Sequence, residues 1–314
     1  MSDWVTAFAP ASIGNVAVGF DMLGLALEGV GDRVAARRVE APGVTVSEVR
    51  GIDGELHPYL STAANENTAS IAAQALLDAH GHGIGIELKV LKGVPLQSGM
   101  GSSAASAVAA VVATNALLDA PLAVDALLPF ALEGEKYASG GLHADNVAPS
   151  LIGGLVLCPQ VLLPEIIRLP VPDGVSAVLL HPDLQVNTAH ARKALAKSVP
   201  MQQWIDQQGL LAGFITACAT NDNALIGRSL RDIIIEPQRS ANVVCFDAVT
   251  EAARKSGALG CSLSGSGPSI FALCKTGDAR NTASAMEHAC RAHGIACQSW
   301  VSPMNAPGAR LVDS

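Results

Sequence analysis

The positions of hydrophobic and polar residues predict strands and helices in an order that suggests two α+β halves. In the first half, short apolar segments bounded by glycine or proline predict strands at residues 4–9, 23–28, 33–39, 44–49 and 85–91. Segments with helical spacing fall at residues 68–79, 102–118 and 124–136, and a short apolar helix follows the loop that carries residues 143–146. We therefore expect helices packed on a sheet.

A proline-rich segment separates this half from the next. Residues 158–174 contain Pro159, Pro164, Pro170 and Pro172, which indicates a domain boundary near residue 172. Strands are then predicted at 175–181, 257–263, 269–274 and 296–302, and helices at 188–197, 201–220, 222–231, 242–256 and 278–293. We expect two domains, residues 1–172 and 173–314, and an α+β sandwich for the second.

Composition narrows the classes of function. The chain has 314 residues, of which 49% are hydrophobic and 15% are charged, so a packed core is expected and disorder is not. The net charge is −8 and no cluster of Lys or Arg is visible, which argues against binding to a nucleic-acid backbone. An acidic protein can still bind a nucleotide through loop amides and Mg²⁺.

The sequence also bears on location. The first residues lack the basic and apolar regions of a signal peptide, and the longest apolar segment, 104–118, is too short to span a bilayer. The seven cysteines form no C-x-x-C pair and lie mostly in apolar surroundings. These features predict a reduced cytoplasmic protein.

The segment with the clearest chemistry is the glycine- and serine-rich loop around residues 94–105. Gly99 and Gly101 permit unusual backbone angles and a close approach to a ligand, and Ser102 and Ser103 lie where a helix begins. Free N–H groups at a helix start bind phosphate, and a serine hydroxyl there can reach Mg²⁺. The alternative is a glycine turn with a serine N-cap that serves folding only.

Other phosphate motifs fit less well. The P-loop motif is absent because the chain contains no Gly-Lys pair. Residues 99–104 match G-x-G-x-x-A, but a proline-containing loop precedes them where a dinucleotide fold needs a strand. Histidines at the spacing of a metal hydrolase are also absent from the sequence.

Three segments together resemble the GHMP kinases. They are residues 9–21, which begin Ala-Pro-Ala-Ser-Ile-Gly-Asn, residues 95–105, and residues 260–269, which read Gly-Cys-Ser-Leu-Ser-Gly-Ser-Gly-Pro-Ser. Residues 19–27, His143 to Ser150 and the Glu236 to Arg239 segment are most similar to the homoserine kinase branch of that family. The third segment could alternatively be a tight turn between strands.

The resemblance implies a fold and a reaction. The fold would be α+β with two domains: an N-terminal ATP-binding domain containing a left-handed βαβ unit, and a C-terminal ferredoxin-like sandwich. ATP and Mg²⁺ would be used to phosphorylate the hydroxyl of L-homoserine in threonine biosynthesis, and a homodimer would be usual. Phosphorylation of another small alcohol, or a non-catalytic binding role, are the competing hypotheses.

The resemblance also assigns roles to residues. Nucleotide binding would fall to the loop and the start of the helix, that is Pro95, Ser98, Gly99, Gly101, Ser102, Ser103, Ala104 and Ala105. Ser103 and Glu135 would hold Mg²⁺. The substrate would meet Asn15, Asp21, His143, Asn146, Arg192 and Arg239, with the two arginines near its carboxylate.

Catalysis would involve Asn146, Asp145 and Arg192, by positioning and with Mg²⁺, without a dedicated general base. Each of these residues has an ordinary structural alternative. Glu135 could be a solvated helix charge, Arg192 could face water, Asn15 could be a turn residue and Asp21 could cap a helix.

Overall fold

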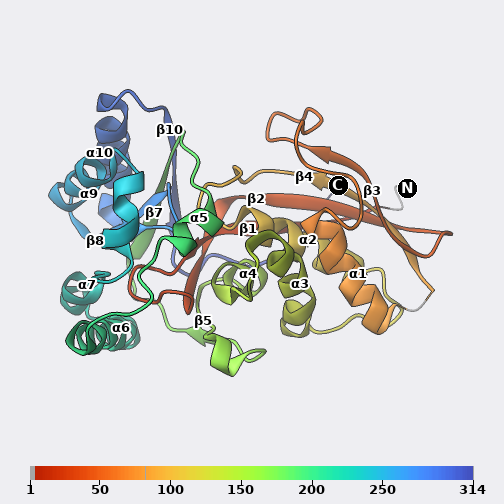
Figure 1. Cartoon of the computed structure of the whole chain (residues 1–314), viewed down its shortest axis with the longest axis horizontal. Helices are drawn as coiled ribbons and strands as arrows, with labels where there is room; N and C mark the ends of the chain where they lie inside the picture. Colours follow the sequence, from red (N-terminus) through yellow and green to blue (C-terminus); the bar gives the residue numbers. More distant parts are fainter. Residues whose placement is uncertain (1–3, 82, 314) are drawn as a thin grey trace.

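The computed structural model of the protein describes residues 4–81 and 83–313 and contains two sheets that lie side by side along its long axis (Figure 1). The first sheet has the strand order β11-β1-β2-β4-β3, and β5 and β6 extend it beside β2. Its strands are β1 (Val5–Gly14), β2 (Leu23–Val39), β3 (Gly43–Arg50), β4 (Gly85–Leu91), β5 (Leu155–Leu157), β6 (Ile167–Leu169) and β11 (Arg310–Val312).

Four helices cover one face of this sheet (Figure 1). They are α1 (Thr68–His80), α2 (Ser102–Asn115), α3 (Leu128–Ser139) and α4 (Ala144–Ile152), with a 3-10 turn, η1 (Val124–Leu127), before α3. The Ala- and Val-rich α2 is buried along nearly its whole length. Gly134 lets α3 approach α1, because a Cβ atom there would lie 2.5 Å from the Thr68 carbonyl oxygen. Small residues therefore pack the helices tightly around α2.

The second sheet has the order β10-β7-β9-β8 and is antiparallel throughout. Its strands are β7 (Val175–Pro182), β8 (Ala258–Leu263), β9 (Ile270–Lys275) and β10 (Cys297–Pro303). The helices of this half are α5 (Thr188–Lys193), α6 (Met201–Thr220), α7 (Asn223–Ser229), α8 (Glu236–Arg239), α9 (Phe246–Lys255) and α10 (Ala279–Ala292), and the further 3-10 turns of the chain are η2 (Gln160–Leu162), η3 (Ser240–Asn242) and η4 (Thr276–Asp278). The predicted α+β class is confirmed, with helices and sheets in both halves.

The predicted break between strands at 23–28 and 33–39 is wrong, since β2 runs without interruption through both. Gly29 and Gly31, which lie between the two predicted strands, do not form a turn but accommodate an irregularity in the pairing with β1, where the register shifts between Pro10 and Ser12. A Cβ atom at Gly31 would lie 2.3 Å from the Ala9 carbonyl oxygen. Glycine here permits close strand contact rather than a turn.

The C-terminal residues return to the first sheet, which the pattern of hydrophobic and polar residues does not predict. β11 pairs antiparallel with β1, with Leu311 opposite Ala7. One hydrophobic cluster also joins the two halves, because Ile13 and Leu25 share it with Phe214 and Phe271. The domain boundary at residue 172 stays a prediction, and the shared cluster packs the two halves against each other.

Candidate active site

The loop predicted to bind phosphate leads directly into the N-terminus of α2. Gly99 and Gly101 have φ angles of 73° and 68°, in the left-handed region that favours glycine. A Cβ atom at Gly99 would lie 2.4 Å from the Ser264 carbonyl oxygen, and one at Gly101 would lie 2.4 Å from Ser12 Oγ. Within the described residues no side chain caps α2, whose N-cap residue is Gly101 itself. The helix start thus presents N–H groups suited to an anion.

Four successive carbonyl groups of this loop are hydrogen bonded to other segments of the protein. The donors are Val186 N to Gln97 O at 3.3 Å, Ser269 N to Ser98 O at 3.2 Å, Ser264 Oγ to Gly99 O at 2.6 Å and Ser12 N to Met100 O at 3.0 Å. All three segments of the family resemblance therefore meet here. Because protein donors occupy these oxygens, the loop favours an anion over a cation.

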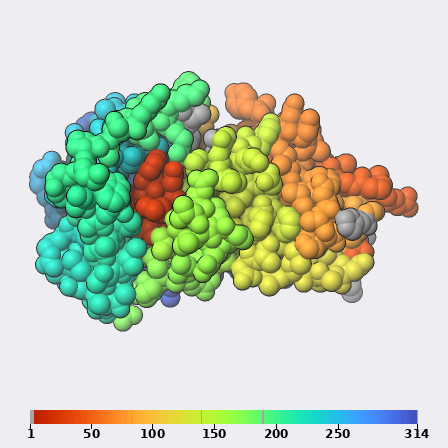
Figure 2. Space-filling view, turned by 60° about the horizontal axis from the view of Figure 1, so that its bottom comes forward, coloured from red at the N-terminus to blue at the C-terminus, as the bar shows by residue number. Residues whose placement is uncertain are grey.

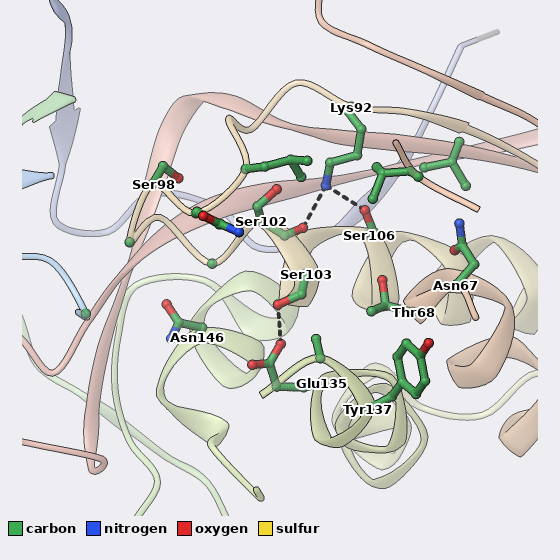
Figure 3. A pocket seen from close by; sticks show the side chains of 18 of the residues that line it. Asn67, Thr68, Lys92, Ser98, Ser102, Ser103, Ser106, Glu135, Tyr137 and Asn146 are labelled. Atoms are coloured by element: carbon green, nitrogen blue, oxygen red, sulfur yellow. Dashed lines mark hydrogen bonds between the residues drawn. The ribbon is translucent and has the colours of Figure 1, made fainter. Parts of the chain in front are cut away.

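A cleft of about 390 Å³ opens beside the loop (Figure 3). At one end it is lined by Asn67, Thr68 and Tyr137, and at the other by Ser98 and Asn146. Leu60, Val90 and Leu96 add apolar surface. The start of α2 lies between these ends, so the cleft combines an anion site with a partly apolar compartment, as a nucleotide requires.

Glu135 is not the solvated charge that its local sequence suggests. Its residue is 6% exposed, and Ser103 Oγ donates a hydrogen bond of 2.6 Å to its Oε2 atom (Figure 3). Ser103 is in the first turn of α2 and Glu135 is on α3, so the packing of these helices places a carboxylate beside the N-terminus that is predicted to bind phosphate. A carboxylate and a hydroxyl at this place are oxygen ligands suited to Mg²⁺.

The segment after β1 has an unusual backbone. Asn15, Val16 and Ala17 have φ angles of 66°, 41° and 57°, and Asp21 has 58°. Such angles are rare for a β-branched residue like Val16 and persist only where surrounding contacts enforce them. Strained backbone of this kind is concentrated at functional sites.

Asn15 supplies those contacts. Its N–H donates to Asp145 Oδ2 at 3.1 Å, its Nδ2 donates to the Gly265 carbonyl at 2.9 Å, and its Oδ1 accepts from Asp21 N at 3.0 Å. The residue is only 7% exposed. Asn15 therefore joins the first and third family segments, and its predicted contact with substrate stays a prediction.

Arg192 does not simply face water but pairs with Asp21. Its Nη2 lies 2.5 Å from Asp21 Oδ1, although 171 residues separate the two in sequence. His143 Nδ1 lies 3.4 Å from the same Arg192 nitrogen. Burial lowers the pKa of His143, and the Arg192 charge lowers it further. These three side chains therefore form one polar group.

Arg239 is a buried residue that also contacts the Phe20 ring. The residue is 3% exposed, and its Nη1 donates to the Gly265 carbonyl at 3.1 Å. The guanidinium carbons of Arg192 and Arg239 lie 5.2 Å and 5.1 Å from the Phe20 ring centroid. Burial lowers the pKa of Arg239, and Arg192 adds to this effect. Two like charges held on one ring are suited to a shared anion such as a carboxylate.

Asn146 and Asp145 are adjacent in sequence but differ in environment. Asn146 lines the cleft, and its Oδ1 accepts from Ser12 Oγ at 3.0 Å. Asp145 is 3% exposed and its carboxylate holds the Asn15 N–H. Burial raises the pKa of Asp145 to about 7, the Asp21 charge adds to this, and the Asn15 hydrogen bond opposes it.

This pKa makes a prediction about stability. In an unfolded chain Asp145 would ionise near pH 4, so between about pH 4 and 7 the folded protein retains a proton that the unfolded chain releases. Stability should therefore fall as pH rises through this window. In an Asp145→Asn variant, the free energy of unfolding should fall by up to about 4 kcal/mol less between pH 4 and 7 than in the wild type, since one pKa unit corresponds to about 1.4 kcal/mol.

Urea unfolding at several pH values measures this effect. Asp125→Asn, at an exposed position on η1, is the matched control and should leave the slope unchanged. Some slope will remain in both, because burial also raises the pKa of Asp232 and Glu236. Equal slopes for the wild type and the Asp145→Asn variant would contradict the assignment.

Other predicted nucleotide residues occupy different places. The Ser102 side chain does not cap the helix but donates to the Val94 carbonyl at 2.9 Å. Ala104 and Ala105 are fully buried in the core, so any contact with nucleotide would involve their backbone. Pro95 lines a neighbouring hollow together with Lys92. Their predicted roles stay predictions.

The comparisons with known proteins identify the family. Residues 67–154 match the family model "GHMP kinases N terminal domain", and residues 214–292 match "GHMP kinases C terminal". A homoserine kinase of Xanthomonas campestris is 43% identical over 307 residues, which cover 98% of this chain and 93% of that protein. The chain belongs to the GHMP kinase family. Membership implies ATP as a substrate.

Further relatives agree in sequence and in structure. A homoserine kinase of Chlorobium phaeobacteroides is 40% identical over 324 residues, covering 98% of this GHMP kinase and 99% of its relative. The crystal structure of homoserine kinase from Cytophaga hutchinsonii has 43% identity and a TM-score of 0.94, covering 99% of this chain and 98% of that one. The predicted two-domain GHMP kinase fold is thus confirmed, and the hand of its βαβ unit stays a prediction.

Some residues of this GHMP kinase site were missed by sequence reasoning. Phe20 lies within the first segment of the family resemblance, residues 9–21, but nothing in its local sequence indicates that two distant arginines contact its ring. Lys92 directly precedes the phosphate loop, and its buried partner Asp32 is 60 residues away on β2. Long-range contacts of this kind have no spacing signature in one sequence.

Two further observations concern metals and membranes. Residues 4–81 and 83–313 contain no group of three or more His, Cys, Asp or Glu side chains arranged to hold a metal ion. None of the helices in those ranges has the length and hydrophobicity that a bilayer crossing needs.

Proposed function

We propose that this protein transfers the γ-phosphoryl group of ATP to the terminal hydroxyl of L-homoserine, a step of threonine biosynthesis. The products are O-phospho-L-homoserine and ADP. The observation that carries the substrate is the group formed by Arg192, Arg239 and Asp21 around Phe20. The relatives that cover nearly the whole chain are named homoserine kinases, so another alcohol or a non-catalytic role is not favoured.

Homoserine is a zwitterion, and each part of it has a suitable group in this proposal. Its carboxylate would meet the two guanidinium groups, and its ammonium would meet the Asp21 carboxylate, with His143 beside it. Asn146 would contact the hydroxyl, because it lines the same cleft as the phosphate loop. This orientation would direct the hydroxyl oxygen toward the N-terminus of α2 and the γ-phosphate.

In the reaction, the hydroxyl oxygen forms a bond to the γ-phosphorus while the bond to the ADP oxygen breaks. The hydroxyl proton would pass to a phosphate oxygen. Asp145 is a poor candidate for a general base, since it is buried and already holds the Asn15 N–H. The amides at the α2 N-terminus would stabilise the charge on the transferring group.

The proposal includes Mg²⁺ held by Glu135 and Ser103. The donor atoms fit a hard cation, because both are oxygens and the carboxylate is buried beside the anion site. Bound Mg²⁺ would neutralise phosphate charge and so favour phosphoryl transfer. A cytoplasmic location is proposed from the cysteines, all seven of which are free. A homodimer stays a prediction from the family resemblance.

Phosphorus NMR of the product tests the position of transfer. With ATP, Mg²⁺ and L-homoserine, we expect one new phosphomonoester signal coupled to a CH₂ group, formed in equal amount with ADP. Inorganic phosphate as the sole product would show that the bound alcohol is not the acceptor, and this would contradict the proposal.

A further inference from the structure

A buried lysine lies at the start of the phosphate loop. Lys92 follows β4 directly, and its side chain is 5% exposed. Its Nζ donates to Asp32 Oδ2. It also donates to the Ser102 carbonyl and to Ser106 Oγ, each at 2.8 Å (Figure 3). Three protein acceptors match the three N–H bonds of the ammonium. The lysine therefore holds the first turn of α2 and is not available as a direct ligand for phosphate.

Asp32, the partner of Lys92 in this buried ion pair, also binds the backbone at the beginning of the phosphate loop. Its side chain is fully buried on β2. Oδ1 accepts from Gly93 N at 2.8 Å and from Val94 N at 3.0 Å, and Oδ2 accepts from Ser106 Oγ at 2.6 Å. One carboxylate thus binds the beginning of the loop and, through Lys92 and Ser106, its end.

The two ends of the loop also bind each other, because Ser102 Oγ donates to the Val94 carbonyl. Residues 93–102 therefore form a nearly closed ring whose neck is the Asp32–Lys92–Ser106 group. Buried ion pairs contribute little net stability, since desolvation offsets their attraction. They can instead select one conformation, and this group fixes both the entry and the exit of the phosphate loop.

We propose that Asp32, Lys92 and Ser106 are positioning residues that set the phosphate loop in its nucleotide-binding conformation before nucleotide arrives. This inference rests on the proposed function, because it assumes that the loop binds the phosphates of ATP. Preorganised amides bind an anion without the cost of ordering the loop. Loosening the neck should therefore weaken nucleotide binding and leave the homoserine side unaffected.

The mildest test is Ser106→Ala, which keeps the ion pair and removes one hydrogen-bond partner from each member. We expect Mg²⁺–ADP to bind about tenfold more weakly by calorimetry, the KM for ATP to rise similarly, and the KM for homoserine to stay within about twofold. Amide hydrogen exchange in residues 93–101 should become faster. Ser176→Ala is the control, because Ser176 is equally buried and bonds Thr276 Oγ1 at 2.9 Å in the second sheet.

A second variant removes both charges of the ion pair and replaces each side chain by a neutral one of similar size. The double variant Asp32→Asn/Lys92→Met should fold better than either single variant. Each single variant leaves one buried charge without its partner, whereas the double variant removes both charges. We expect it to bind Mg²⁺–ADP at least tenfold more weakly than the wild type. A lower melting temperature with wild-type ADP affinity, in this variant and in Ser106→Ala, would overturn the positioning role and leave only a structural one.

The same measurements separate this proposal from the proposed function. Tight ADP binding by the wild type without turnover of homoserine would overturn the substrate assignment, while the variants would still decide the role of the neck. Wild-type protein that binds no Mg²⁺–ADP would overturn both.

Discussion

Replacing Glu135 by glutamine should lower kcat about a thousandfold while the protein stays folded. Glutamine keeps the shape and can still accept the Ser103 hydrogen bond of 2.6 Å, so the packing of α3 on α2 should be preserved. It removes the negative charge beside the phosphate loop. A divalent cation would then be held much more weakly where charge neutralisation drives phosphoryl transfer.

The measurement is the initial rate as a function of Mg²⁺ concentration, together with the melting temperature. The matched control is Glu133→Gln on the same helix, whose side chain is 48% exposed and pairs with Lys136 at 3.5 Å. The control should behave as wild type, because exposed pairs contribute little. If Glu135→Gln kept its kcat within about threefold at every Mg²⁺ concentration, the metal assignment would be wrong.

Replacing Arg239 by lysine should lower kcat/KM for homoserine about a thousandfold with little change in ADP affinity. Lysine keeps the charge but lacks the planar fork that binds a carboxylate and stacks on an aromatic ring. Arg239 is buried, stacks on Phe20 and holds the Gly265 carbonyl, so lysine cannot reproduce its geometry. Loss of a buried bidentate contact commonly costs about 2–5 kcal/mol.

An acceptor without the carboxylate makes this test specific. 2-Aminobutane-1,4-diol retains the amine and a terminal hydroxyl, and the wild type should use it far less well than homoserine. The Arg239→Lys variant should lose most of that preference, because its carboxylate contact is already impaired. Arg231→Lys, at an exposed position nearby, is the control. An undiminished preference in the Arg239→Lys variant would show that the carboxylate binds elsewhere.

The sequence predicted best where function depends on local backbone properties. Gly99 and Gly101 have the positive φ angles and close contacts that their positions suggested, and the helix begins at Ser102 as expected. The α+β class and the GHMP kinase family were also correct. The loop and the helix start were predicted correctly because helix starts and glycine turns are encoded by neighbouring residues.

Prediction failed where distant segments determine the outcome. The unbroken β2 depends on its pairing with β1, and β11 depends on a return to the first sheet across the whole chain. Glu135 is a different case: its local sequence alone favours a solvated helix charge, whereas the family resemblance placed it on Mg²⁺. The packing of α3 against α2 buries the residue, and its role as a metal ligand stays a prediction. The left-handed angle of Val16 is enforced by Asn15 contacts to Asp145 and Gly265, which no local pattern reveals.

The most direct test of the central claim is an ADP-release assay with Mg²⁺–ATP and a panel of acceptors, namely L-homoserine, L-serine, L-threonine, mevalonate and galactose. We predict strong, Mg²⁺-dependent turnover with L-homoserine and at most slow turnover with the others. In the proposed site, the carboxylate and the ammonium group of the substrate would be bound at a fixed distance from the reacting hydroxyl. Of these five acceptors, homoserine alone has both groups at that distance. Preferential turnover of mevalonate or galactose would contradict the substrate site built on Arg192, Arg239 and Asp21, and folded protein inactive on every acceptor would contradict the kinase itself.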